Sequence, residues 1–112
     1  MNFARNSHGI CVFRDHIYVA GGCVDEGGYT AECERYNFDT EYPKSYGKWE
    51  KVAPLNAPSL GPCLANFNDR YIFKFGGLAG VNQPNNMIER YDPNIDKWIE
   101  IRCNLFGFDD LS

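Results

Sequence analysis

An internal repeat constrains the fold of this chain more than any other feature of its sequence. A shift of 55 positions superposes residues 15–22 on residues 70–77, so that Gly21-Gly22 coincides with Gly76-Gly77. No gap is needed in this superposition between residues 5 and 37. A period of about 50 residues is typical of stacked supersecondary units, because one such unit cannot bury its apolar faces alone.

Each copy of the repeat contains four short segments that we predict to be β-strands. They are residues 9–13, 17–20, 33–37 and 49–52 in the first copy, and 64–67, 71–75, 88–92 and 98–101 in the second. The dipeptides Arg14-Asp15 and Asn68-Asp69 predict tight hairpins, and Asp92-Pro93-Asn94 predicts a further turn. Residues 17–20 are apolar on both pleat faces, which indicates a strand covered on both sides. We therefore expect small sheets stacked face to face, with almost no helix.

Both copies resemble the kelch repeat in the order and spacing of three features. A glycine pair is followed by a tyrosine (Tyr36, then Tyr91) and by a tryptophan (Trp49, then Trp98). Residues 88–98 are especially similar to kelch-like adaptors. The resemblance implies an all-β chain of two consecutive four-stranded antiparallel blades of a kelch β-propeller. Since a closed propeller has about four to eight blades, this propeller is incomplete.

We predict a first blade in residues 1–56, a second in 57–103, and a tail or the start of a further blade in 104–112. Three features depart from the kelch pattern. The first copy lacks the Asp-Pro turn, six extra residues within 41–47 lengthen one connection, and Lys74 interrupts an apolar strand. Two blades alone leave two apolar faces in water, so we expect a fragment of a longer protein or cover from a partner.

Composition argues against several classes of partner and site. The formal net charge is −4 and the 11 Lys and Arg residues are scattered, which argues against nucleic-acid binding. The start of the chain lacks a secretory pattern and the apolar runs are short, so no membrane insertion is expected. Five cysteines without a Cys-x-x-Cys motif indicate neither a disulfide framework nor a zinc site. We expect free thiols in a reducing, cytoplasmic environment.

No catalytic, cofactor-binding or metal-binding residue is predicted. The glycine pairs lack the spacing of a phosphate-binding loop, and they are expected to permit positive φ and close packing. The tyrosines and tryptophans recur with the repeat, which favours packing between blades over a ligand cage. Arg35 and Arg90 also recur, so we expect a structural ion pair or hydrogen bonds to a neighbouring blade. His8 and Cys11 should lie on opposite faces of a strand, which argues against a metal site.

The connections that do not repeat are the candidates for partner binding, because loops on a rigid scaffold commonly carry function. The second-to-third-strand connections, together with the link between the copies, should form one surface. Its candidate residues are Asp25, Glu26, Tyr29, Asn82, Gln83 and Asn85. On the opposite surface, Tyr42 and Tyr46 in the insertion offer an aromatic anchor. A solvated length variation explains the insertion equally well.

These patterns favour a non-catalytic protein–protein interaction module that acts as a scaffold or subunit of a larger intracellular assembly. The expected partners are proteins, either a larger complex or the remaining blades of the propeller. One alternative is the substrate-recognition part of a kelch-type ubiquitin-ligase adaptor. Another is a fragment of a kelch-propeller enzyme, although the ligand cluster of a copper oxidase cannot be recognised. A third is a structural brace whose strand faces are capped by neighbours.

Overall fold

The computed structural model describes residues 5–6, 8–24, 28–37, 48–80, 83–84 and 86–101. Within these residues the chain forms β-strands, turns and irregular connections, as the sequence predicts. Since no helix occurs among them, none of the described segments is a membrane-spanning helix. The predicted tail at 104–112 lies outside the described residues, and the predicted blade limits stay a prediction.

The first repeat forms a four-stranded antiparallel sheet, which we call sheet 1. Its strands, in spatial order, are β2 (Gly9–Phe13), β3 (His16–Ala20), β5 (Cys33–Asn37) and β6 (Lys48–Val52). Arg14 and Asp15 form the turn between β2 and β3, with φ values of 49° and 63°. Two successive left-handed residues match the twist of a tight hairpin, which confirms the turn predicted from this dipeptide.

The second repeat forms an equivalent sheet, sheet 2. Its strands, in spatial order, are β7 (Cys63–Phe67), β8 (Tyr71–Phe75), β11 (Ile88–Asp92) and β12 (Lys97–Ile101). The turn between β11 and β12 begins at Asp92, whose carboxylate accepts a hydrogen bond from the Asn94 amide at 2.9 Å. An aspartate that bonds to the amide two residues later stabilises such a turn.

The structure corrects the predicted register of the first strand in the repeat. Phe13 pairs with His16, and Phe67 pairs with Tyr71. Since His16 and Tyr71 occupy equivalent positions in the next strand, Phe67 is the counterpart of Phe13, one residue earlier than the gapless superposition predicts. The β7–β8 hairpin contains one more residue than the β2–β3 hairpin. The correction matters because a shift of one residue exchanges the two faces of a strand.

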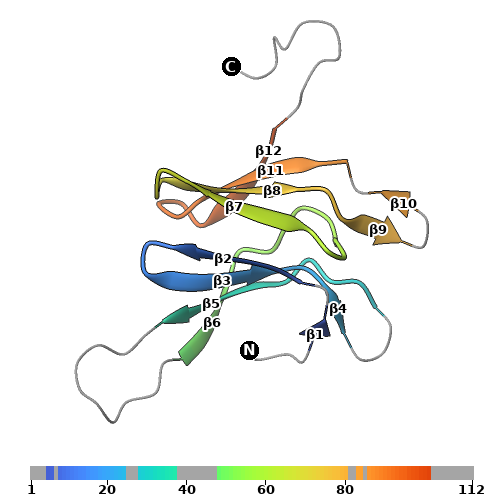
Figure 1. Cartoon of the computed structure of the whole chain (residues 1–112), viewed down its shortest axis with the longest axis horizontal. Helices are drawn as coiled ribbons and strands as arrows, with labels where there is room; N and C mark the ends of the chain where they lie inside the picture. The colour runs from blue at the N-terminus through green and yellow to red at the C-terminus, as the bar shows by residue number, and fades with distance from the viewer. Residues whose placement is uncertain are drawn as a thin grey trace, which may run out of the picture.

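Four short strands extend the core sheets at one end of the molecule. They are β1 (Arg5–Asn6), β4 (Cys23–Val24), β9 (Leu78–Gly80) and β10 (Gln83–Pro84). β1 pairs with β4, and β9 pairs with β10, both antiparallel. Each ribbon lies beyond the glycine pair of its sheet, at the same end of the molecule (Figure 1).

The two sheets lie face to face, with β2 and β7 next to each other (Figure 1). We call the interface between them the junction. The buried apolar residues that form the core come from both sheets and from the link between them: Phe13, Tyr18, Ala20, Cys33, Leu55, Leu64, Ile72, Tyr91 and Trp98. The hydrophobic core of the described residues therefore lies at the junction, and each sheet contributes one face to it.

Candidate functional site

The link between the sheets, residues 53–62, is held by the connection between β3 and β5. The Leu55 amide donates to the Ala31 carbonyl oxygen at 2.8 Å, and the Ser59 amide donates to that of Thr30 at 3.2 Å. In the opposite direction, the Gly22 amide donates to the Ser59 carbonyl oxygen at 2.7 Å. These backbone hydrogen bonds fix the link at the end of sheet 1 where β3 and β5 are connected.

The same link is also bound to the connection between β8 and β11. Leu60 and Leu78 exchange two backbone hydrogen bonds, both 2.8 Å long. The hydroxyl of the buried Ser59 donates to the Gly76 carbonyl oxygen at 3.1 Å. The β3–β5 connection, the β8–β11 connection and the link therefore form one hydrogen-bonded surface, which we call the loop surface.

The glycine pairs shape the loop surface. Gly21 and Gly77 have φ values of 70° and 93°, in the left-handed region that favours glycine. A Cβ atom on Gly21 would lie 2.4 Å from the Ser59 carbonyl oxygen, and one on Gly77 would lie 2.1 Å from the Ser59 hydroxyl. A Cβ atom at either position would therefore require Ser59 to move. The structure thus agrees with the prediction that the glycines permit positive φ and close packing.

The structure describes two of the eight residues predicted to bind a partner. Tyr29 is half-buried on the loop surface and forms an isolated β-bridge with Cys23. Gln83 is exposed in β10 on the same surface. Leu78, which directly follows the second glycine pair, is 38% exposed there and was not predicted. The other six candidates lie outside the described residues: Asp25, Glu26, Asn82, Asn85, Tyr42 and Tyr46.

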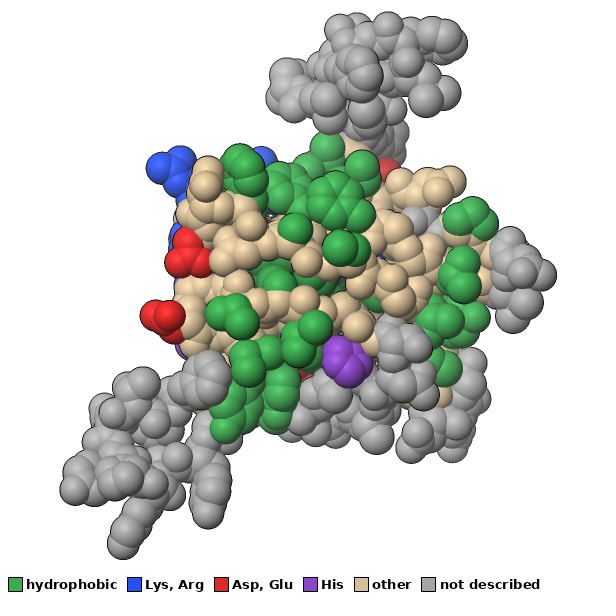
Figure 2. Space-filling model, in the orientation of Figure 1, with side chains coloured by type: hydrophobic (Ala, Val, Ile, Leu, Met, Phe, Trp, Pro, Cys, Tyr) green, Lys and Arg blue, Asp and Glu red, His purple; other side chains and the backbone are tan. Residues whose placement is uncertain are grey.

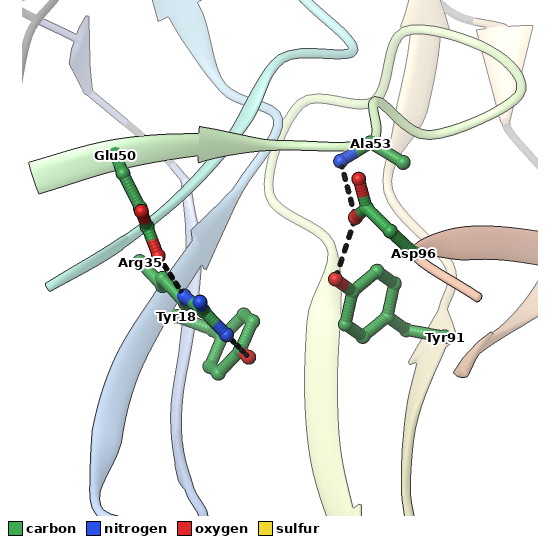
Figure 3. A network of polar contacts seen from close by, with 6 residues as sticks. All are labelled: Tyr18, Arg35, Glu50, Ala53, Tyr91 and Asp96. Carbon is green, nitrogen blue, oxygen red and sulfur yellow. Dashed lines mark hydrogen bonds and ion pairs between the residues drawn. The ribbon is translucent and has the colours of Figure 1, made fainter. Parts of the chain in front are cut away.

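At the junction, hydrogen bonds join the second tyrosine and the second tryptophan of the repeat to the link; Figure 3 shows those of Tyr91, Asp96 and Ala53. The Tyr91 hydroxyl donates to Asp96 Oδ1 at 2.7 Å, and the Ala53 amide donates to the same oxygen at 2.9 Å. The Trp98 indole N–H donates to the Ala53 carbonyl oxygen at 2.9 Å. The hydrogen bond from Tyr91, followed by that from Ala53, holds the pKa of Asp96 below its ordinary value.

Arg35 faces this network from sheet 1. Its guanidinium forms an ion pair with Glu50 and donates to the Tyr18 hydroxyl at 3.1 Å (Figure 3). Hydrogen bonds from Asn37 and then Arg35 lower the pKa of Glu50. The structural ion pair predicted for this arginine is therefore present, within its own sheet. An open pocket of about 230 Å³ lies between this pair and Tyr91.

A buried charge pair lies in sheet 2 at the junction. Lys74 and Glu89 are opposite each other on β8 and β11, and both side chains are fully buried. The Lys74 ammonium donates to the Met87 carbonyl oxygen at 3.1 Å, while Glu89 Oε1 accepts from the amide and the side chain of Asn56, each at 2.8 Å. Burial lowers the pKa of Lys74 and raises that of Glu89. Asn56 thus ties the link to the buried carboxylate.

Arg90, the counterpart of Arg35, lies on the opposite face of sheet 2. Its guanidinium carbon is 4.5 Å from the centre of the Tyr71 ring, a cation–π contact. Its Nε is buried and has no hydrogen-bond partner among the described residues. Among the described residues, this arginine makes a ring contact and not the predicted ion pair or hydrogen bond.

Four of the five cysteines lie in the described part of the chain. Cys11, Cys23, Cys33 and Cys63 are free thiols. Burial raises the pKa of the Cys11 thiol to about 11, which disfavours the nucleophilic thiolate at neutral pH. Among the described residues, no group of three or more His, Cys, Asp or Glu side chains is arranged to hold a metal ion.

Comparison with known proteins agrees with this architecture. The family model of the kelch motif matches residues 4–56 and 60–104. The chain belongs to the kelch-repeat family. Sheets 1 and 2 are therefore two consecutive blades of a kelch β-propeller, and the propeller that they form is incomplete. In sheet 2, the repeat tyrosine and tryptophan lie in the junction, and the glycine pair lies at the loop surface.

Several relatives show the same likeness. The chain is 30% identical to beta-scruin of Limulus polyphemus over 98 residues, covering 88% of this chain and 11% of scruin. It is 30% identical to human Kelch-like protein 23 over 91 residues, covering 81% and 14% of the two chains. It is also 27% identical to N-(sulfonatooxy)prop-2-enimidothioate sulfolyase of Thlaspi arvense over 117 residues, covering 92% and 33%. The chain thus spans a third or less of the length of these relatives.

Proposed function

We propose that this chain is a non-catalytic protein–protein interaction module, and that its two blades act as scaffold or subunit of a larger intracellular assembly. The loop surface is the observation that carries the proposal. It consists of three connections joined by backbone hydrogen bonds, and it is held on two packed sheets. A surface ordered before binding loses little conformational entropy when a partner binds, which favours recognition.

The chemistry of the loop surface suits a protein partner with a basic segment. Leu78 offers exposed apolar area at the surface, and Gln83 offers an amide for neutral hydrogen bonds. Hydrophobic side chains are visible at the end of the molecule where β9 and β10 lie (Figure 2). In the sequence, Asp25 and Glu26 add negative charge to the same connection as Tyr29. The proposed partner contacts are thus apolar and neutral in the second repeat and acidic in the first.

A second candidate is the substrate-recognition part of a kelch-type ubiquitin-ligase adaptor. The 30% identity to Kelch-like protein 23 favours it. In that case the loop surface would bind the protein that is to be modified. The 27% identity to the Thlaspi arvense sulfolyase is the observation that favours the enzyme alternative.

The proposal is tested by comparing proteins cross-linked to the chain and to two variants in living cells. In Leu78→Glu, a charge replaces an exposed leucine of the loop surface. In Ile95→Glu, a charge replaces a more exposed apolar residue, 54% exposed in the β11–β12 turn at the opposite end of the sheets. We expect specific partners that are lost from Leu78→Glu and retained by Ile95→Glu. Partners retained by Leu78→Glu and lost from Ile95→Glu would contradict the assignment of the loop surface.

A further inference from the structure

Each sheet has one face in the junction and one face away from it, which we call its open face. On sheet 1, Val12, Ile17, Tyr36 and Trp49 form one row across the open face. On sheet 2, Ala65, Phe73, Arg90 and Ile99 form a row across the open face. Hydrophobic side chains are visible at the outer margin of sheet 2 and on part of that of sheet 1 (Figure 2).

The open face of sheet 1 repeats the side chains that sheet 2 uses in the junction. The junction row of sheet 2 is Asn66, Ile72, Tyr91 and Trp98. The equivalent open row of sheet 1 has isoleucine, tyrosine and tryptophan at the same last three positions. The open face of sheet 1 therefore carries the pattern needed to pack on a surface like the junction face of sheet 1.

The open face of sheet 2 in turn resembles the junction face of sheet 1. Phe67 is 53% exposed, whereas its counterpart Phe13 is fully buried in the junction. In the other direction, Ile10 on the open face of sheet 1 is 59% exposed, and its counterpart Leu64 is 8% exposed in the junction. Of the six large hydrophobic residues exposed in the described part of the chain, four lie on the two open faces: Ile10, Val12, Phe67 and Phe75. Exposed apolar area of this kind marks an interaction surface.

On the open face of sheet 2, the side chain of Arg90 has a buried donor without an acceptor among the described residues. Its counterpart Arg35 has Glu50 as partner, but the residue equivalent to Glu50 is Ile99. The buried Nε of Arg90 therefore needs an acceptor from another molecule or segment. In the junction, Tyr91 lines the same pocket as Arg35, and the residue equivalent to Tyr91 on sheet 1 is Tyr36. In an equivalent contact, Tyr36 of the next blade would line a pocket together with Arg90, as Tyr91 does with Arg35.

We propose that a second copy of this chain packs the open face of its sheet 1 on the open face of sheet 2, and so repeats the junction between molecules. The contact joins two different faces, so it is heterologous, and such contacts produce a ring when the rotation closes. Propellers of four to eight blades correspond to two, three or four copies of a two-blade chain. This inference goes beyond the proposed function, because it concerns the open faces and not the loop surface.

The test uses two charge substitutions that each block one open face. Ile10→Glu places a carboxylate on the open face of sheet 1, and Phe67→Glu places one on the open face of sheet 2. Both side chains are exposed in one copy, so circular dichroism should show the same β-structure in the variants and in the unaltered chain. Ile95→Glu is the matched control, because this residue has the same exposure and lies on neither open face.

Light scattering should give a mass of two to four copies for the unaltered chain and for Ile95→Glu. Each of the two face variants alone should give the mass of one copy. An equimolar mixture of Ile10→Glu and Phe67→Glu should form pairs, because each variant keeps the face that the other lacks. A single copy or an aggregate of undefined size for the unaltered chain would overturn the proposal. So would a mixture that stays at one copy, or face variants that associate as the unaltered chain does.

Discussion

The hydrogen bond between Tyr91 and Asp96 gives a quantitative test of the junction. Tyr91→Phe removes the hydroxyl that donates to Asp96 Oδ1 at 2.7 Å and keeps the ring that packs on Tyr18. A hydrogen bond to a charged group contributes about 1.5–3 kcal/mol. Asp96 is exposed, so water replaces part of this contribution and the lower end applies. We expect the free energy of unfolding to fall by about 1.5 kcal/mol at pH 7.

Urea unfolding measures this loss. With an m-value of about 1.5 kcal/mol per molar urea, the midpoint should fall by about 1 M. Tyr71→Phe is the matched control, since the Tyr71 ring lies under Arg90 on the open face and its hydroxyl makes no hydrogen bond to the described residues. The control should change the free energy of unfolding by less than about 0.5 kcal/mol.

The loss should also depend on pH. The pKa of Asp96 is lower in the folded chain than its ordinary value of 3.8, so the stabilisation is present above that value. It disappears as the pH falls through the lower pKa of the folded state. The difference between the unaltered chain and Tyr91→Phe should therefore shrink below about pH 4. A difference under 0.5 kcal/mol at pH 7, or one that stays constant down to pH 2.5, would refute the role given to this hydrogen bond.

Three further changes test the core, the link and the thiols. Phe13→Ala empties a fully buried position at the junction and should lower the free energy of unfolding in urea by about 3–5 kcal/mol; a loss below 1 kcal/mol would contradict its burial. Asn56→Ala removes a side-chain donor from the buried Glu89 carboxylate and should cost about 1–3 kcal/mol in the same assay, unlike a surface substitution. In thiol titration of the Ile10→Glu variant at pH 8, where no second copy covers sheet 2, the exposed Cys63 should react rapidly. Cys11, with a pKa of about 11, should react only after denaturant is added; equal rates would contradict the structure.

The repeat made the eight strands of the two sheets predictable from the sequence. Its period placed equivalent strands, and Arg14-Asp15 and Asn68-Asp69 placed the hairpins between them. The structure has left-handed φ values at all four of these turn residues. The turn residues and the repeat thus predict the same strand ends. The predicted strand bounds therefore agree with the observed ones within one residue.

The register of β7 was not predictable in the same way. The extra residue in its hairpin is Arg70, whose amide donates to the Phe67 carbonyl oxygen at 3.0 Å. Nothing in the alternation of β7 reveals the insertion, because Ala65 and Asn66 give no clear difference between its two faces. Only pairing with β8 assigns each side chain to a face.

The short strands of the loop surface were also missed. They contain two or three residues each, too few for a hydrophobic period to appear. Leu78 pairs with Leu60 across 18 positions of the sequence, so its conformation depends on the link and not on its own neighbours.

The sequence identified Lys74 as an exception in an apolar strand but did not identify the residue that it faces. A lysine in an apolar strand indicated a local exception, and the structure places Glu89 opposite it on β11. Predicting this pair requires the register of β8 against β11, which the sequence analysis did not assign. Six of the eight proposed partner-binding residues lie outside the described part of the chain, so their role stays a prediction.

The two kelch blades pack face to face through a buried aromatic junction. Nuclear Overhauser effects between the rings of Tyr18 and Tyr91 in the purified chain measure this packing most directly. The ring centres lie 5.7 Å apart, so we predict cross-peaks between the two rings, and these should persist in Ile95→Glu. A well-dispersed β-sheet spectrum without contacts between these rings would contradict the account.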